Sequence, residues 1–217
     1  MSSLSVISLA TNGYLKYWKE LVLSAENRLF TDEVITFHIF TDSEIEAQDF
    51  VSDLDFANFC IHPIPNLKWP EATLHRYKYI FENANHFQDD YLIYLDADMK
   101  VISKTPSKVV DVFSKDLMTL VKHPGYWRPS GFNLFFFYLN NPFRFLSDIR
   151  LKVSLGGLGA WDCNRESKAF VPRKLRKEYL CGGTWGGPRK LVTKMCFVLM
   201  EDIEDNERRG ILARWHD

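Results

Sequence analysis

The sequence lacks most features that mark secreted, membrane-spanning or zinc-binding proteins. Its 217 residues include only four cysteines, and none of them is spaced as a paired metal ligand or as part of a disulfide framework. No basic segment of the signal-peptide type opens the chain, and no apolar run approaches the roughly 18 residues of a membrane helix. We therefore expect reduced thiols, a cytoplasmic location and no membrane span.

An excess of charge of one sign is also lacking. Acidic and basic residues nearly balance, so the formal net charge of -1 provides no overall field that would attract nucleic acid or an anionic membrane. Hydrophobic residues make up 46% of the chain, which is typical of a folded globular protein. Because no linker, repeat or low-complexity segment interrupts the sequence, we predict a single domain over residues 1–217.

The order of apolar patterns predicts an α/β fold. Short apolar or alternating runs predict strands, and apolar stripes with helical spacing predict helices. In chain order these are a strand at Ser5–Leu9, a helix at Lys16–Phe30, strands at Val34–Phe40 and Phe59–Ile64, a helix at Ala72–Phe87, strands at Tyr91–Leu95 and Leu117–Val121, and a helix at Arg189–Asp202. This alternation is typical of a mostly parallel sheet flanked by helices. The segment Asn133–Leu139 is apolar on both faces and predicts either a buried strand or an interface.

Two carboxylates, Asp96 and Asp98, follow the predicted strand Tyr91–Leu95. Ligand sites in α/β sheets form beyond the carboxyl ends of the strands. If the chain stays extended here, both carboxylates lie on one face and Ala97 points away. Such a pair suits Mn²⁺ or Mg²⁺, with diphosphate oxygens and water completing the coordination shell. The alternative is a solvated turn, because Asp-x-Asp is a common tripeptide.

A series of segments in a fixed order surrounds this pair. They are Leu9–Tyr14, Trp18–Glu20, Ser24–Glu26, Phe40–Asp42, Trp69–Arg76, Tyr91–Met99, His123–Tyr126, Tyr179–Gly187 and Trp215–Asp217. Together they resemble the retaining glycosyltransferase family that holds the ABO blood-group transferases, the α-1,3-galactosyltransferases and their bacterial and phage relatives. The match touches most of the chain, and the ordered set is far more specific than any one motif.

The resemblance implies a GT-A fold, in which a nucleotide-binding half at about residues 1–122 merges with an acceptor-binding half at about residues 123–217. It implies a Mn²⁺-dependent hexosyltransferase, with Mg²⁺ as the other candidate ion. The donor would be UDP-galactose or UDP-N-acetylgalactosamine, and the acceptor a galactoside glycan joined in α-1,3 linkage with retention at the anomeric carbon. Without an anchor segment, the expected location is the cytoplasm of a bacterium or of a phage-infected cell.

For the donor nucleotide, the resemblance assigns the backbone at Leu9, Ala10 and Thr11 to the base edge. It assigns the ring of Tyr14 to stacking on uracil, and Arg76 to the donor sugar and diphosphate or to an aspartate of the metal motif. Outside the family context, Tyr14 would be interpreted as a half-buried packing tyrosine and Arg76 as a solvated arginine on a helix face.

For the diphosphate and the donor sugar, the resemblance assigns Asp96–Asp98 to the metal-bound diphosphate. Cys181, Gly182 and Gly183 lie where the family tunes donor choice. The space left by a glycine at Gly183 favours N-acetylgalactosamine over galactose. The alternative is a glycine-rich loop that leads into the last predicted helix.

For the acceptor, the resemblance assigns His123 to the acceptor sugar, with Gly125 leaving room for that sugar. Trp215 resembles an aromatic floor beneath the sugars. His216 and Asp217 resemble the pair that bonds the hydroxyls of the donor sugar, so the predicted catalytic residues are Asp217, His216 and the arginine at position 76. The alternatives are a structural histidine and a frayed chain end.

Two departures from the family pattern affect these assignments. The chain stops at Asp217, where relatives continue with a glutamate that is the candidate nucleophile or the group that stabilises the oxocarbenium face. If the chain is complete, we expect donor binding with little transfer. The stretch Arg128–Ala160 is also longer than the matching loop of the relatives, so the acceptor is the least specified part of the prediction.

Other functions remain open at this stage. A nucleotidyltransferase would also bind a nucleotide on an α/β sheet with metal carboxylates, but Asn12 and Gly13 fall short of its glycine-rich phosphate loop. A protein that binds or hydrolyses nucleotide sugars without efficient transfer, or a sugar-binding module, is the further alternative. Metal-dependent binding of UDP would separate these possibilities.

Overall fold

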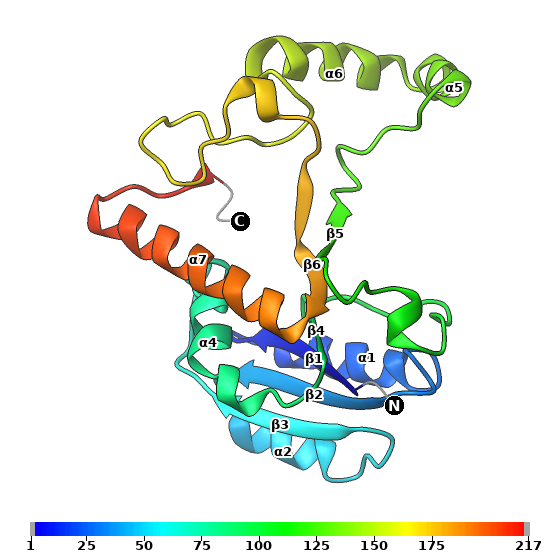
Figure 1. The fold of residues 1–217 in the computed structure, drawn as a ribbon, viewed down its shortest axis with the longest axis vertical. Helices are drawn as coiled ribbons and strands as arrows, with labels where there is room; N and C mark the ends of the chain where they lie inside the picture. The colour runs from blue at the N-terminus through cyan, green and yellow to red at the C-terminus, as the bar shows by residue number, and fades with distance from the viewer. Residues whose placement is uncertain (1–2, 215–217) are drawn as a thin grey trace. The chain divides into compact units, whose positions relative to one another are not determined.

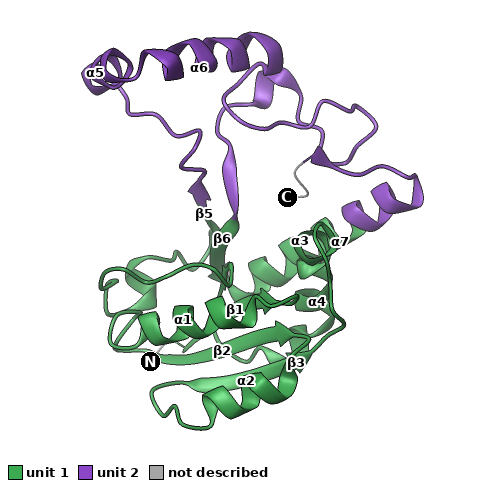
Figure 2. Cartoon of the chain, turned by 180° about the vertical axis from the view of Figure 1, so that it is seen from behind, with its two compact units in different colours: residues 1–120, 183–201 green, residues 121–182, 202–217 purple. Residues whose placement is uncertain are grey.

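The computed structural model describes residues 3–214, which form two compact units (Figures 1 and 2). Within this range, unit 1 comprises residues 3–120 and 183–201, and unit 2 comprises residues 121–182 and 202–214. All four cysteines are free thiols, as expected. Among the described residues, we find no helix that combines the length and the apolar character needed to cross a membrane.

Five of the six strands of the sheet were predicted from the sequence. The sixth, at Leu180–Pro188, falls where a glycine-rich loop was considered, and that alternative is wrong because the segment is a strand. The six strands are β1 (Ser3–Ala10), β2 (Val34–Thr41), β3 (Asn58–Pro63), β4 (Tyr91–Leu95), β5 (Thr119–Lys122) and β6 (Leu180–Pro188). They form one sheet in the order β3-β2-β1-β4-β6-β5. β3, β2, β1 and β4 run parallel to one another, and β6 runs antiparallel to β4. The predicted α/β fold with a mostly parallel sheet flanked by helices is therefore confirmed.

Helices of unit 1 cover both faces of this sheet. They are α1 (Leu15–Ala25), α2 (Glu44–Val51), α3 (Glu71–Leu74), α4 (Arg76–Glu82) and the part of the long α7 (Arg189–Arg208) that precedes residue 202, with 3-10 turns at Ala84–His86 and Val109–Asp111. The apolar stripe of α1, which includes the fully buried Trp18, packs against Val6 and Phe37 in the main core. On the other face, His38 of β2 packs edge-on against Phe87 at a ring distance of 4.7 Å.

The helix predicted at Ala72–Phe87 is interrupted twice. The first break falls at His75, between α3 and α4, where Arg76 donates from Nε to the backbone carbonyl of Thr73 at 2.8 Å. The second falls at Asn83, whose side-chain amide bonds the carbonyl of Tyr79 at 2.9 Å. Both side chains donate hydrogen bonds to backbone carbonyls of the preceding turn. Such bonds compete with the backbone bonds that would continue the helix. The helix predicted at Lys16–Phe30 likewise ends early, at Ala25.

Unit 2 contains two helices that the sequence analysis did not predict, α5 (Phe132–Asn140) and α6 (Pro142–Leu155), and a 3-10 turn at Arg173–Leu175. The buried strand considered for Asn133–Leu139 is wrong, because this segment is helical and none of its residues is buried. Gly131, with a φ of 61°, precedes the helix in a conformation that favours glycine. The interface alternative for this segment stays open.

A charged cluster holds α5 and α6 to the rest of unit 2. Arg128 donates from Nη2 to Asp148 at 2.7 Å, and the hydroxyl of Tyr138 donates to the same carboxylate at 2.9 Å. Asp148 is only 2% exposed. Burial opposes its ionisation, but the hydrogen bonds from Arg128 and Tyr138 outweigh that effect and lower the pKa of Asp148. The interior of unit 2 therefore contains a buried ion pair, whereas the core of unit 1 is mainly apolar.

Candidate functional site

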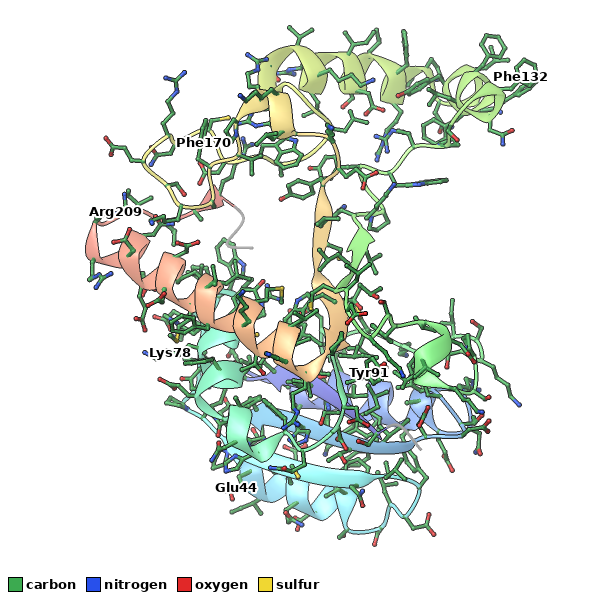
Figure 3. All side chains as sticks on the ribbon, viewed as in Figure 1. Glu44, Lys78, Tyr91, Phe132, Phe170 and Arg209 are labelled. Carbon is green, nitrogen blue, oxygen red and sulfur yellow. The ribbon has the colours of Figure 1, made fainter. Side chains whose placement is uncertain are left out.

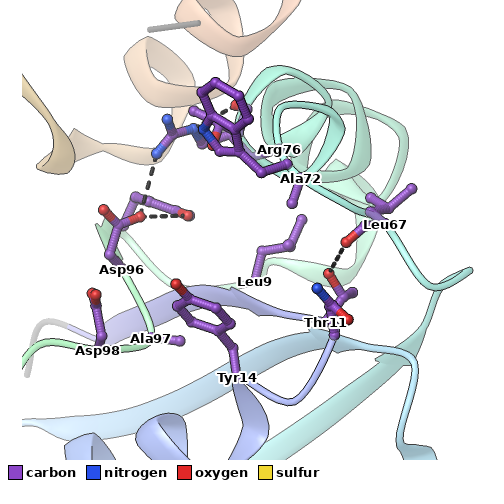
Figure 4. Close-up of a pocket in the computed structure, with 13 residues that line it drawn as sticks. Leu9, Thr11, Tyr14, Leu67, Ala72, Arg76, Asp96, Ala97 and Asp98 are labelled. Atoms are coloured by element: carbon purple, nitrogen blue, oxygen red, sulfur yellow. Dashed lines mark hydrogen bonds and ion pairs between the residues drawn. The ribbon is translucent and has the colours of Figure 1, made fainter. Parts of the chain in front are cut away.

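A pocket of about 230 Å³ opens at the carboxyl ends of β1 and β4 (Figure 4). These neighbouring strands are parallel, so their carboxyl ends meet at one edge of the sheet. The chain adds β2 and β3 on one side of β1 and then adds β4 on the other side. Sheets of α/β proteins bind ligands at such a switch point between neighbouring strands. The lining comes from unit 1 and consists of Leu9, Thr11, Asn12, Tyr14, Leu67, Trp69, Ala72, Thr73, Arg76, Tyr94, Asp96, Ala97 and Asp98.

The turn from β1 into α1 brings Tyr14 to the pocket. Asn12 and Gly13 have φ values of 54° and 83°, and the backbone N–H of Tyr14 bonds the carbonyl of Thr11 at 3.1 Å. The Tyr14 ring is 47% exposed and its edge contacts Tyr17 at 5.4 Å between ring centres. An open ring at this edge can stack on a flat ligand group, as predicted for this tyrosine.

The hydroxyl of Thr11 fixes the opposite wall. It donates to the backbone carbonyl of Leu67 at 2.9 Å and so ties the segment before α3 to the end of β1. Leu9 and Ala10, the other residues predicted near the base, lie at this same strand end, and Leu9 lines the pocket. The sequence analysis did not assign Leu67, Trp69, Ala72 or Thr73 to the site, although the last three belong to a segment that it matched to the family.

Arg76 is buried at the back of the pocket. It is only 2% exposed, so the alternative of a solvated arginine on a helix face is wrong. Nη1 donates to Oδ1 of Asp96 at 3.3 Å, which joins two residues that the sequence analysis placed in one site (Figure 4). The guanidinium carbon also lies 5.3 Å from the centre of the Tyr94 ring. This arrangement brings a cation and a carboxylate to one wall of the cavity.

Tyr94 is a member of the site that the sequence analysis missed. Its hydroxyl donates to Oδ1 of Asp96 at 3.0 Å, and its ring stacks on Trp185 at 4.9 Å. Burial, more than any neighbouring charge, raises the pKa of Tyr94 far above its usual value, so the hydroxyl remains a neutral donor. The available signal was its position two residues before Asp96, since residues i and i+2 of a strand share a face.

The carboxylates of Asp96 and Asp98 line the same side of the pocket (Figure 4). The expected extended backbone is wrong here, because the N–H of Met99 bonds the carbonyl of Asp96 at 3.1 Å and closes a turn. Ala97 is buried inside that turn, and Asp98 is exposed. Among residues 3–214, no cluster of three or more histidine, cysteine or acidic side chains is placed to hold a metal. The pair therefore suits a cation only if a ligand supplies further oxygens.

Gly183 of β6 lies directly against Asp96. Its carbonyl accepts the N–H of Asp96 at 2.9 Å, and a Cβ atom added to Gly183 would sit 2.3 Å from Oδ2 of Asp96. The prediction of an open space beside this glycine is therefore wrong, because the Asp96 carboxylate fills that space. The absence of a side chain at Gly183 thus makes room for the Asp96 carboxylate. Cys181 and Gly182 precede it on the same strand and belong to unit 2.

His123 and Gly125 lie in unit 2 and line a separate cavity of about 570 Å³ there. The N–H of Gly125 donates to Nδ1 of His123 at 3.0 Å, which leaves the proton of a neutral ring on Nε2. A Cβ atom at Gly125 would lie 3.0 Å from Cε1 of His123, so the glycine makes room for the histidine ring. The turn at Gly125 thus fixes the direction of the histidine, and the space beside the glycine, which was expected to take the acceptor sugar, is taken by the histidine ring. Trp215, His216 and Asp217 lie outside the described residues.

Comparison with characterised proteins gives an independent line of evidence. The whole chain aligns over 226 residues with "Histo-blood group ABO system transferase 1" of Rattus norvegicus at 24% identity, and with transferase 2 of the same organism at 23%. The chain spans about half the length of these relatives, 54% and 57% respectively. No protein-family model matches it. The chain is thus distantly similar, over its whole length, to ABO blood-group transferases, the same family that its ordered segments resemble.

Proposed function

We propose that this chain is a retaining hexosyltransferase with a single GT-A domain, and that unit 1 binds UDP-galactose or UDP-N-acetylgalactosamine. The proposed acceptor is a galactoside glycan, and the proposed linkage is α-1,3. The observation that carries this proposal is the convergence, at the switch point of one sheet, of an open aromatic ring, a buried arginine and two carboxylates.

Each wall of the pocket corresponds to one part of the donor. The exposed ring of Tyr14 stacks on uracil, and the end of β1 at Leu9–Thr11 meets the edge of the base. The carboxylate wall takes the diphosphate. Because the space at Gly183 is filled by Asp96, this glycine gives no reason to prefer one of the two donor sugars.

Asp96 and Asp98 are the residues that would hold Mn²⁺, or Mg²⁺ in its place. Two hard carboxylates at a pocket wall fit such a cation when diphosphate oxygens complete its coordination. The bound cation would neutralise charge on the departing diphosphate. Arg76 and Tyr94 both donate to Oδ1 of Asp96, so they hold this carboxylate in one orientation before the donor arrives. The buried guanidinium also adds fixed positive charge to the wall where the leaving group gains negative charge.

Unit 2 provides the proposed acceptor residues. His123 accepts a hydrogen bond at Nδ1 from its own turn, so its Nε2–H is the group that would bond an acceptor hydroxyl. We propose that Trp215 contacts the sugars and that His216 and Asp217 orient the donor sugar. The acceptor hydroxyl would then attack the anomeric carbon on the face from which UDP departs. It would do so directly, as the bond to UDP breaks, or after a carboxylate nucleophile has displaced UDP and is itself displaced by the acceptor.

A UDP-release assay tests this function. UDP-galactose, UDP-N-acetylgalactosamine, UDP-glucose and UDP-N-acetylglucosamine are compared with Mn²⁺ or with a chelator, each with and without a galactoside acceptor. We expect release from one of the first two donors, dependent on the metal and faster with the acceptor. Metal-dependent release that ignores the acceptor would favour a hydrolase, and binding of free sugar without nucleotide would favour a sugar-binding module.

A further inference from the structure

The two helices of unit 2 carry their apolar side chains on the outside. On α5, Phe132, Phe135, Phe136 and Leu139 follow the spacing i, i+3, i+4, i+7 and therefore form one stripe. Their exposed fractions are 76%, 61%, 46% and 63%. The half-buried residues of this helix lie on its opposite side. A helix that packs only against its own protein turns such a stripe inward, and α5 does the reverse.

The same inversion occurs on α6. Phe143, Leu146, Ile149 and Val153 are spaced by three, three and four residues, and they are exposed by 87%, 63%, 44% and 73%. The buried residue of α6 is Asp148, which lies on the far side of the helix and pairs with Arg128. The inner side of α6 thus carries this charge pair beside the half-buried Leu151 and Leu155, and the four apolar side chains of the stripe are exposed. We call the two outward stripes together the apolar face, and Figure 3 shows Phe132 projecting at one end of it.

Charge on these helices distinguishes between possible occupants of the apolar face. The stretch Arg128–Ala160 contains four cationic residues and a single carboxylate, although the whole chain has a net charge of -1. That carboxylate is Asp148, which is buried and paired. Arg150 and Lys152 are exposed beside the α6 stripe. A second copy of the chain on this face would bring like charges together, whereas an anionic surface would complement them.

We propose that the apolar face of α5 and α6 binds peripherally to a membrane surface that contains anionic lipids. Exposed phenylalanine and aliphatic side chains enter the boundary between headgroups and acyl chains, while Arg150 and Lys152 stay at the level of the lipid phosphates. The five phenylalanines Phe132, Phe135, Phe136, Phe143 and Phe145 are all exposed on these two helices, which suits shallow insertion. The local positive charge supplies the attraction that the nearly neutral chain as a whole lacks.

Co-sedimentation with vesicles tests the proposal without any measurement of enzymatic activity. The probes are vesicles of phosphatidylcholine alone and vesicles of phosphatidylcholine and phosphatidylglycerol in equal amounts. We expect the chain to pellet with the mixed vesicles, far less with phosphatidylcholine alone, and less as salt is raised. Arg150→Gln with Lys152→Gln should weaken binding to the mixed vesicles by about tenfold, since each basic residue near the surface contributes on the order of a few-fold.

The apolar contribution is tested by Phe132→Ser, Phe135→Ser and Phe136→Ser combined, which should reduce pelleting by at least about tenfold. All three side chains are largely exposed, so the fold does not depend on them. The matched control is Ile45→Ser with Ile102→Ser, two side chains of unit 1 that are 79% and 91% exposed, and it should pellet like the original chain. Pelleting by the triple variant equal to that of the original chain would overturn the proposal. The proposal would also be overturned if the original chain did not pellet with either kind of vesicle and instead formed a dimer, seen by sedimentation velocity, that dissociates in the triple variant.

Discussion

Unit 1 and unit 2 are stabilised by different means. Nearly all the buried apolar side chains belong to unit 1, whereas the described part of unit 2 buries only Trp161 and Ala213 among its hydrophobic residues. Unit 2 instead buries polar and charged side chains, including Asp148 and Arg176. An apolar core fixes the strand ends that form the pocket of unit 1. In unit 2 the interior is mainly polar, and many apolar residues of α5 and α6 are exposed. The difference predicts that unit 1 holds a preformed site and that unit 2 is sensitive to the loss of single charges.

The largest expected effect concerns the preformed site of unit 1. Asp96→Asn combined with Asp98→Asn should reduce Mn²⁺-dependent release of UDP by at least about a hundredfold, because loss of groups that merely support metal ligands already costs 10–100-fold. The circular dichroism spectrum should stay close to that of the original chain, because asparagine keeps an oxygen that accepts from Arg76 and Tyr94. The matched control is Asp53→Asn with Asp55→Asn, an exposed pair with the same spacing in unit 1, which should leave release unchanged. Full activity in the first variant would remove the metal from the mechanism.

The next effect tests the polar interior of unit 2. Arg128→Leu leaves the Asp148 carboxylate buried without its cation, and breaking such a pair costs about 3 kcal/mol or more of stability. Lys122→Leu removes the exposed ion pair with Glu178 in the same unit and should cost less than about 1 kcal/mol. Hydrogen exchange during urea titration measures both values and locates them. Equal losses in the two variants would contradict the claim that buried charges stabilise unit 2.

A smaller effect is expected at the open ring of the pocket. Tyr14→Ala should weaken UDP binding by about tenfold, since stacking of a base on an aromatic ring contributes about 1–3 kcal/mol. Tyr14→Phe keeps the ring and should bind like the original chain. Tyr17→Ala removes the neighbouring ring, which contacts Tyr14 but does not line the pocket, and serves as the control. If Tyr14→Ala binds UDP normally, this ring does not stack on the base.

The last expected effect, on stability and not on ligand binding, is a dependence of unit 1 on pH. Burial lowers the pKa of His38 to about 3 and that of His62 to about 4, and the proximity of the other histidines acts in the same direction. The unfolded chain titrates near 6.5 and binds more protons at mildly acidic pH, so stability falls as the pH drops from about 6.5 toward 4. Thermal melts between pH 7 and pH 4.5 should show this decline, and His62→Gln should flatten it. An unchanged slope in that variant would assign the decline to other groups.

Much of unit 1 was predictable from sequence because its strands are apolar runs bounded by turn residues. Tyr91–Leu95 was predicted with the bounds that the structure has, and Asp96 and Asp98 follow it as expected. The contact between Gly183 and Asp96 was not predictable, because it depends on antiparallel pairing between strands far apart in the chain. The breaks in the helix near Arg76 were missed because side chains, and not the apolar pattern, end those turns.

Unit 2 was harder to predict for a different physical reason. The segment Phe132–Leu139 is apolar at nearly every position, so its sequence contains no contrast between faces that would reveal a period of 3.6 residues. The stripe on α5 becomes visible only when the structure separates exposed from half-buried positions. Similarly, the charge pair of Arg128 and Asp148 joins residues of separate segments, and nothing in their spacing suggests it.

Titration calorimetry of UDP, with Mn²⁺ present and again with a chelator in excess, tests the central claim most directly. The claim is that the pocket of unit 1 binds a nucleotide through Tyr14, Arg76 and a cation held by Asp96 and Asp98. We predict clear binding with Mn²⁺ and a loss of at least about tenfold in affinity when the metal is removed. Equal affinity under both conditions, or no binding of UDP under either, would contradict it.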